Sequence, residues 1–138
     1  MSSTESIRTY DSNGNMTYYR DSGGREWWSE FDSNSNEIYY KDSTGFEIWR
    51  EHDTNGKMIH EKDSDGRERW WEYDSNGKCI YSCNNKGYEE WHEYDSNGNQ
   101  IHYKDSDGYE FWYWNGEETE DPVKILLLAS QVNSKVAP

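Results

Sequence analysis

Residues 10–30 read YDSNGNMTYYRDSGGREWWSE, and this unit of 21 residues begins again at Phe31, His52, Tyr73 and Tyr94. Each unit opens with an aromatic or His residue followed by Asp, and a Trp recurs at one fixed place in every unit. Self-similarity at a short fixed period is typical of repeat architectures, in which identical elements stack on one another. The Trp column consists of Trp28, Trp49, Trp70, Trp91 and Trp112.

Two turn motifs divide each unit. Asp, Ser and Asn side chains hydrogen-bond to nearby backbone, and Gly readily adopts a positive φ. The runs between the turns are rich in Tyr, Trp, Ile and Thr, which is typical of strands. We therefore predict an all-β fold, an antiparallel β-hairpin repeat meander of about 10–11 short strands in one curved single-layer sheet. The motifs are Asp-Ser-Asn-Gly, as at 11–14, 74–77 and 95–98, and Asp-Ser-x-Gly, as at 21–24, 42–45, 63–66 and 105–108.

The register follows from the turn lengths. A four-residue loop at 21–24 would pair Thr17 with Trp28, and the same register in later units would pair an Ile with each Trp. Because the period is odd, the Trp column changes faces at every unit unless one loop holds an odd number of residues. The Tyr-Asp-Ser-Asn-Gly-Asn loop suits a type I turn with a bulge at Gly. We therefore expect one face to carry Trp49, Trp70 and Trp91 beside Ile59 and Ile80.

Strand alternation assigns the remaining side chains to faces. Glu26 and Glu30 share a face with Trp28, and the later units repeat this arrangement. This register places the Tyr and His column, together with most of the Lys and Arg residues, on the opposite face. The sequence thus predicts an acidic Trp face and a basic aromatic face. The Tyr and His column consists of Tyr18, Tyr39, His60, Tyr81 and His102.

Two regions are predicted along the chain: residues 1–120 form the five-unit repeat domain, and residues 121–138 form a capping helix and tail. Asp121 is a suitable helix N-cap, and Pro122 suits the first helical position. The segment 123–129 is the one aliphatic run in the sequence. Terminal elements of repeat arrays are atypical because they must cover the exposed end of the stack.

Composition limits the compartment and the partners. The net charge is −14, which disfavours direct contact with nucleic acid, because binding to phosphates requires basic residues. Cys79 and Cys83 would lie roughly 13 Å apart along one strand, too far to form a disulfide with each other. The start of the given sequence is polar, from which we expect no secretion signal and no membrane span. We expect free thiols and a cytoplasmic protein that does not bind membranes.

The repeat resembles the YD repeats of Rhs-type and teneurin proteins. The resemblance covers about Thr4 to Trp114 and rests on the Tyr-Asp-Ser-Asn-Gly-Asn, Asp-Ser-x-Gly and Trp-x-Glu-Tyr-Asp motifs. It implies a hairpin-repeat sheet of the kind that, in longer members of this family, spirals into shells around toxin domains. Five units are too few for a shell. The resemblance transfers no active site.

No catalytic or cofactor-binding motif stands out. Glycosidases use one pair of carboxylates in a cleft, whereas Glu pairs recur here in four units, as in a solvated acidic face. The segments Asp63-x-Asp65-Gly66 and Asp105-x-Asp107-Gly108 resemble fragments of calcium loops, but the closing Glu is absent. Turn formation explains these Asp residues, and calcium binding stays an open alternative. We expect a protein that is not an enzyme and needs no metal or cofactor.

Two functional classes remain. The first is an acidic protein-interaction module that binds a basic protein, such as a nucleic-acid-binding enzyme, in the manner of a phage inhibitor of host defence or an immunity protein. The second is a carbohydrate-binding or cell-surface repeat that uses its Trp and Tyr faces. We also expect a homo-oligomer, because one sheet layer leaves an apolar stripe in water. If the acidity serves only solubility, neither class is needed. The predicted partner-binding residues are Glu47, Glu51, Glu68, Glu72, Glu89, Glu93, Asp42, Asp63 and Asp105.

Overall fold

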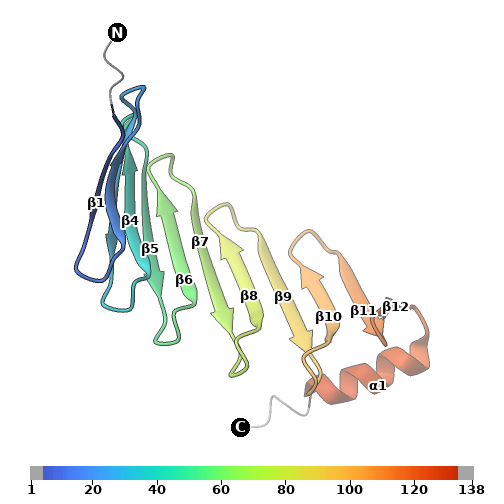
Figure 1. Ribbon diagram of the computed structural model, residues 1–138. Helices are drawn as coiled ribbons and strands as arrows, with labels where there is room; N and C mark the ends of the chain where they lie inside the picture. Colours follow the sequence, from blue (N-terminus) through green and yellow to red (C-terminus); the bar gives the residue numbers. More distant parts are fainter. Residues whose placement is uncertain (1–4, 134–138) are drawn as a thin grey trace. The chain divides into compact units, whose positions relative to one another are not determined.

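The computed structural model describes residues 5–133, which form twelve β-strands and one α-helix (Figure 1). The strands follow one another at nearly constant length, as expected for a repeat. In chain order the elements are β1 (Ile7–Tyr10), β2 (Met16–Arg20), β3 (Glu26–Phe31), β4 (Glu37–Asp42), β5 (Glu47–His52), β6 (Met58–Asp63), β7 (Glu68–Tyr73), β8 (Cys79–Asn84), β9 (Glu89–Tyr94), β10 (Gln100–Asp105), β11 (Glu110–Trp114), β12 (Glu117–Glu118) and α1 (Pro122–Asn133).

The strand order is the sequence order, β1 to β12. This confirms the predicted antiparallel hairpin meander with one C-terminal helix. Within the described residues the strands number twelve rather than ten or eleven, because β12 adds a two-residue strand that pairs with β11. The chain divides into two units, residues 5–70 and 71–133, and the boundary falls inside β7. Each unit is described separately below.

Both turn motifs build the same five-residue loop. In the β2–β3 hairpin, the Asp21 N–H donates to the Arg25 carbonyl at 2.9 Å, and Gly24 has a φ of 84°. In the β1–β2 hairpin, Asp11 and Asn15 form the equivalent 2.9 Å hydrogen bond. The Asp carboxylate also accepts hydrogen bonds from two N–H groups of its own loop, as in an Asx turn. The β2–β3 loop therefore includes Arg25, the residue after Gly, which the predicted four-residue loop at 21–24 had left in the strand.

This longer loop shifts the register by one residue. Trp28 pairs with Tyr18 and Trp49 pairs with Tyr39. The predicted Thr17–Trp28 and Ile–Trp pairs are wrong, and so is the placement of the Tyr and His column on the face opposite Trp. A bulge in the other hairpin, between Glu30 and Phe31 for example, shifts the register once more per 21-residue repeat. Within each unit of the structure, the Trp residues consequently stay on one face. The sequence predicted this result, because a repeat with an odd number of residues keeps its Trp column on one face only if one loop has an odd length.

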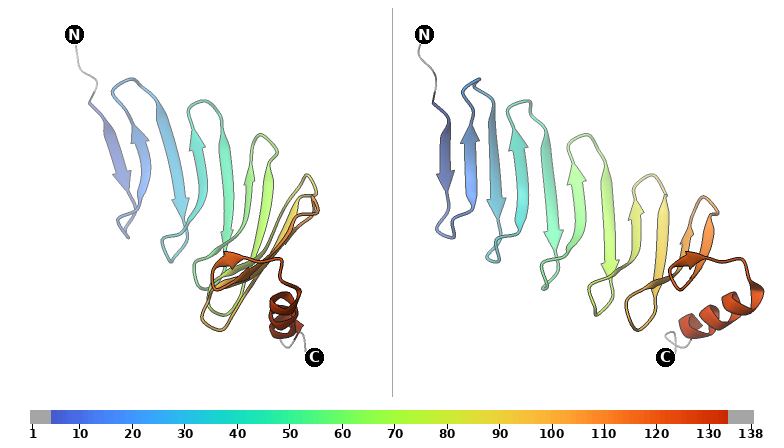
Figure 2. Two further views of the ribbon diagram at one scale, coloured as in Figure 1. Left: turned by 90° about the vertical axis from the view of Figure 1, so that its right-hand side faces the viewer. Right: turned by 45° about the vertical axis from the view of Figure 1, so that its right-hand side comes forward.

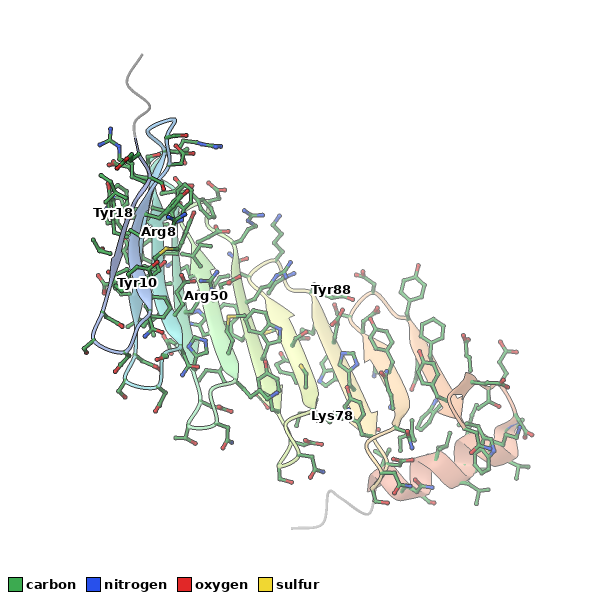
Figure 3. All side chains as sticks on the ribbon, viewed as in Figure 1. Arg8, Tyr10, Tyr18, Arg50, Lys78 and Tyr88 are labelled. Carbon is green, nitrogen blue, oxygen red and sulfur yellow. The ribbon has the colours of Figure 1, made fainter. Side chains whose placement is uncertain are left out.

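The predicted separation of charge between the faces is also wrong. Lys41 lies opposite Glu47, on the same face as Trp49, whereas Arg50 lies on the other face, opposite Glu61. Both faces of the sheet therefore carry acidic and basic side chains. Figure 3 shows side chains projecting from both faces, with Arg50 labelled.

Helix α1 belongs to the second unit and begins where the sequence predicted. The Val123 N–H donates to Asp121 Oδ1 at 2.9 Å, which is an N-cap hydrogen bond. Figure 2 shows α1 lying beside the last strands of this unit. Leu128 of the helix and Ile101 of β10 are 4% and 5% exposed, and they are the buried apolar side chains of the described chain. Residues 134–138 of the predicted tail lie outside the described residues.

The other apolar side chains of the described residues are only partly buried or are exposed. Trp49 is 41% exposed and Trp91 is 36% exposed. Cross-strand side-chain contacts, rather than a second layer, therefore supply most of the packing in the strands. Among residues 5–133, no helix is both long and apolar enough to span a membrane.

Candidate functional site

The candidate site is the Trp face, defined in each unit as the sheet face that carries the Trp column. Each Trp ring lies against an aromatic ring of the preceding strand; the three Tyr–Trp pairs are tilted and the two His–Trp pairs are stacked. The ring centroids are 5.6 Å apart in Tyr18–Trp28, 5.8 Å in Tyr39–Trp49, 5.2 Å in His60–Trp70, 5.7 Å in Tyr81–Trp91 and 3.8 Å in His102–Trp112.

The first Glu column is fixed by the same Tyr and His side chains. The Tyr39 hydroxyl donates to Glu47 at 2.7 Å, and the Tyr81 hydroxyl donates to Glu89 at 2.7 Å. His60 Nε2 lies 2.9 Å from Glu68 Oε1. The hydrogen bond from Tyr39 is the main reason that the pKa of the Glu47 carboxyl is lowered. This carboxyl is therefore ionised at neutral pH and held next to a Trp ring.

The second Glu column flanks the other side of the Trp residues. Glu51 and Glu93 lie 3.3 Å and 3.0 Å from the Nδ1 atoms of His60 and His102. Glu72 occupies the same column and lines a pocket with Glu89 and Glu93. The structure therefore places six predicted Glu residues on the Trp face: Glu47, Glu51 and Glu68 in the first unit, and Glu72, Glu89 and Glu93 at the pocket of the second.

The predicted Asp residues have a different environment. The Oδ1 atoms of Asp42 and Asp63 accept backbone N–H groups of their own loops at 2.8 Å and 3.0 Å. Asp105 is 5% exposed, and its carboxylate accepts the Asp107 and Tyr109 N–H groups and the Tyr103 hydroxyl. These carboxylates stabilise turns. Their contribution to partner binding stays a prediction, and it rests on their charge rather than on free lone pairs.

A basic residue accompanies the first Glu column in most repeats. Lys41 Nζ lies 3.4 Å from Glu47 Oε1, and Arg20 Nε lies 4.0 Å from Glu26 Oε1. Lys62 and Lys104 occupy the same register opposite Glu68 and Glu110. In the β8–β9 hairpin, Cys83 takes this place opposite Glu89.

A pocket of about 680 Å³ opens on the Trp face of the second unit. Its lining includes the rings of β8 and β9 and four carboxylates, and Val132 from the last turn of α1 forms part of the wall. The repeat pattern does not predict this pocket, because it does not indicate where α1 packs against the strands. The side chains that matter most here are Tyr81, Trp91, Glu72, Glu89, Glu93 and Val132.

The opposite face is occupied by internal contacts. In the first unit Arg50 forms ion pairs with Glu37 and Glu61. In the second unit the Tyr88 hydroxyl, labelled in Figure 3, donates to Glu90 at 2.8 Å and lies 3.2 Å from the Tyr103 hydroxyl. Hydrogen bonding to Tyr103 and Glu90 raises the pKa of Tyr88 far above its ordinary value. These polar groups bind one another on the face opposite the Trp column.

The described residues contain no group of three or more His, Cys, Asp or Glu side chains arranged to hold a metal ion. At one of the calcium-like turns, the Arg67 guanidinium lies 2.8 Å from Asp63 Oδ2 and 3.4 Å from Asp65 Oδ2. The Arg67 guanidinium thus occupies the place between the two carboxylates that a bound calcium ion would take. Cys79 and Cys83 are free thiols, as predicted.

No protein-family model matches this chain, and no curated protein is significantly similar to it. Solved structures are similar in fold. The crystal structure of TcdB2-TccC3-TEV matches with a TM-score of 0.68 and 15% identity over 79% of this chain and 6% of that chain. TcdB2-TccC3-Cdc42 gives 0.63 and 16% over 72% and 5%, and TcdB2-TccC3 gives 0.63 and 15% over 83% and 6%.

This chain therefore spans about one twentieth of the length of the chains it resembles. At such low identity the likeness concerns the fold alone. The hairpin-repeat fold occurs in those structures, and the match is consistent with a repeat of the Rhs/YD type.

Proposed function

We propose that this protein is a non-enzymatic interaction module, built from short YD repeats, that binds a basic protein through its Trp face. The observation that carries the proposal is the repeated group of a partly exposed Trp between two Glu columns. Trp49 is 41% exposed, and the Glu47 carboxylate beside it is held by Tyr39. Aromatic anchors surrounded by polar groups are the usual centres of binding energy at protein interfaces.

Electrostatics favour a basic partner. With a net charge of −14, the chain attracts positively charged surfaces over long range and accelerates their association. Each exposed carboxylate contributes only ~0–1 kcal/mol, but ordered columns act together. A nucleic-acid-binding enzyme presents such a basic surface, because it must contact phosphates. Inhibition of such an enzyme, by a phage-type inhibitor or an immunity protein in the cytoplasm, is the role we propose.

The test converts Glu47, Glu68 and Glu89 together to Gln and follows association with the basic protein recovered from host lysate at low salt. We expect a slower association rate and a shallower dependence on ionic strength. The matched control converts Glu117, Glu118 and Glu120 to Gln, which changes the net charge equally in the segment around β12. If both triple variants behave like the wild type, acidity serves only solubility and the proposal is wrong.

A second candidate is carbohydrate binding, which the pocket of the second unit favours. Planar Tyr81 and Trp91 rings beside carboxylates could stack on a sugar ring and accept its hydroxyl hydrogen bonds. A glycan array tests this candidate, because sugar binding would persist at high salt whereas a basic protein would dissociate.

Self-association competes for the same face. A homo-oligomer formed through the Trp face would bury the exposed rings without any foreign partner. Light scattering at tens of micromolar distinguishes the two cases, since a monodisperse monomer leaves the Trp face free for another protein.

A further inference from the structure

One repeat lacks the basic residue that the others carry. Arg20, Lys41, Lys62 and Lys104 each lie opposite the first Glu column on the Trp face. At the equivalent place β8 has Cys83, opposite Glu89. Within residues 5–133, no Lys or Arg forms an ion pair with Glu89. The turn of that hairpin also differs, with Asn84 and Asn85 in place of Asp and Ser. The aromatic framework is kept, because the Tyr81–Glu89 hydrogen bond and the Tyr81–Trp91 contact match those of Tyr39, Glu47 and Trp49.

The carboxylate that lacks a basic partner, Glu89, lines a cavity. The pocket of about 680 Å³ is lined by Tyr81 and Trp91 on its aromatic side and by four carboxylates, and Val132 of α1 supplies an apolar wall. All of these residues belong to the second unit. In this repeat, therefore, a small thiol replaces the long cationic side chain opposite Glu89, and the same Glu89 lines a cavity with an aromatic surface, an apolar wall and further negative charge.

We propose that this pocket binds an arginine side chain of the basic partner, in the position that an internal Lys or Arg occupies in the other repeats. The inference rests on the proposed function and adds the chemistry of the group recognised. A guanidinium group is planar, stacks on Trp, and forms paired hydrogen bonds with carboxylates. Glu89 receives the charge, Glu72, Asp74 and Glu93 add negative charge to the lining, and Trp91 provides the stacking surface.

The test uses a defined probe, the capped tripeptide Gly-Arg-Gly, with Gly-citrulline-Gly as its neutral isostere. Binding to the full chain is followed by the indole N–H resonances of the Trp residues at low salt. We expect a saturable shift of the Trp91 resonance with the arginine peptide and at least tenfold weaker binding of the citrulline peptide. Equal binding of the two peptides would overturn the proposal, because the pocket would then recognise shape rather than charge.

Cys83→Lys is the sharper experiment, because it restores the pattern of the other repeats. The new ammonium group should pair with Glu89, as Lys41 pairs with Glu47, and weaken binding of the arginine peptide at least tenfold. Cys79→Lys is the matched control, since it introduces the same side chain into the same strand at a residue that does not pair with Glu89. Unchanged affinity in Cys83→Lys, with normal thermal unfolding, would contradict the proposal.

Glu89→Gln gives an independent readout if Cys83→Lys does not fold. It removes the charge but keeps the size of the side chain and should also weaken peptide binding at least tenfold. The Glu47→Gln/Glu68→Gln variant separates this inference from the proposed function, because both changes lie in the first unit. If that double variant slows association with the basic protein while the arginine peptide fails to bind, the pocket assignment is wrong and the interaction function stands.

Discussion

The β4–β5 and β8–β9 hairpins have the same framework and differ in one position of the Trp face. Tyr39 and Tyr81 each donate to a Glu at 2.7 Å, and their rings lie 5.8 Å and 5.7 Å from the neighbouring Trp. Opposite that Glu, the first hairpin has Lys41 and the second has Cys83. The comparison teaches that turns and aromatic pairs fix the geometry, whereas a single variable column decides whether a carboxylate is neutralised within the chain.

The largest expected effect lies outside both hairpins, at the helix contact that closes the second unit. Leu128→Ala should lower the free energy of unfolding by about 3 kcal/mol, as expected for a buried Leu. Leu127→Ala is the control, because Leu127 is 50% exposed. Chemical denaturation of the full chain measures both. Equal losses from the two variants would mean that α1 does not cover the sheet through Leu128.

The two hairpins should respond alike to removal of their Trp residues. Trp49→Ala and Trp91→Ala should each cost about 2 kcal/mol, which is less than for a core Trp because both rings are partly exposed. Thermal and denaturant unfolding provide the values. A clear difference between the variants would show that the frameworks are not equivalent and that the pocket around Trp91 adds stability of its own.

Removal of the Tyr39 hydroxyl should change the pH dependence of the stability more than the magnitude of the stability. Hydrogen bonding by Tyr39 lowers the pKa of Glu47 from 4.5 in the folded state. The resulting stabilisation is present above pH 4.5 and is lost as pH falls through the folded pKa. Tyr39→Phe should therefore reduce the stability lost on acidification below pH 4.5, as measured by denaturation at a series of pH values. An identical acid profile in wild type and variant would contradict this cause.

The smallest effect concerns the loop between β3 and β4. Ser35 has a φ of 65°, in the left-handed region that the equivalent loops reserve for Gly. Ser35→Gly should raise the free energy of unfolding by about 0.5 kcal/mol, because relief of the steric cost exceeds the added chain entropy. Gly14→Ser is the reciprocal control, since a Cβ there would meet no atom within 4 Å. If Ser35→Gly destabilises the protein, the Ser35 side chain contributes to the loop.

The sequence predicted the strands, the turns and the constant face of the Trp column, because these follow from a 21-residue period and from the conformational preferences of Asp and Gly. It did not predict the register, since Arg25 belongs to the loop rather than to the strand. The useful signal was the shared Asp-x-x-Gly spacing, which implies the same loop in both hairpins. With the incorrect register, Tyr39 was not placed opposite Trp49, and the hydrogen bond from Tyr39 to Glu47 was therefore not predicted.

The candidate site was predicted in part. The Glu residues flank the Trp column as expected, because alternation along a strand depends only on sequence spacing. The pocket could not be predicted, since Val132 reaches it through the packing of α1 against the sheet. The replacement of Lys by Cys83 was visible in the sequence, but its place opposite Glu89 became apparent only with the correct register.

The bulge that occurs once in every repeat limits how chains of this kind can change length. Because it compensates for an odd period, duplication or loss of a whole 21-residue unit adds or removes two strands and leaves every later side chain on its original face. Loss of a single residue within a strand instead inverts the faces of all strands beyond it. Unequal recombination between complete repeats is thus structurally tolerated, whereas a small in-frame deletion in a strand exchanges the two surfaces downstream.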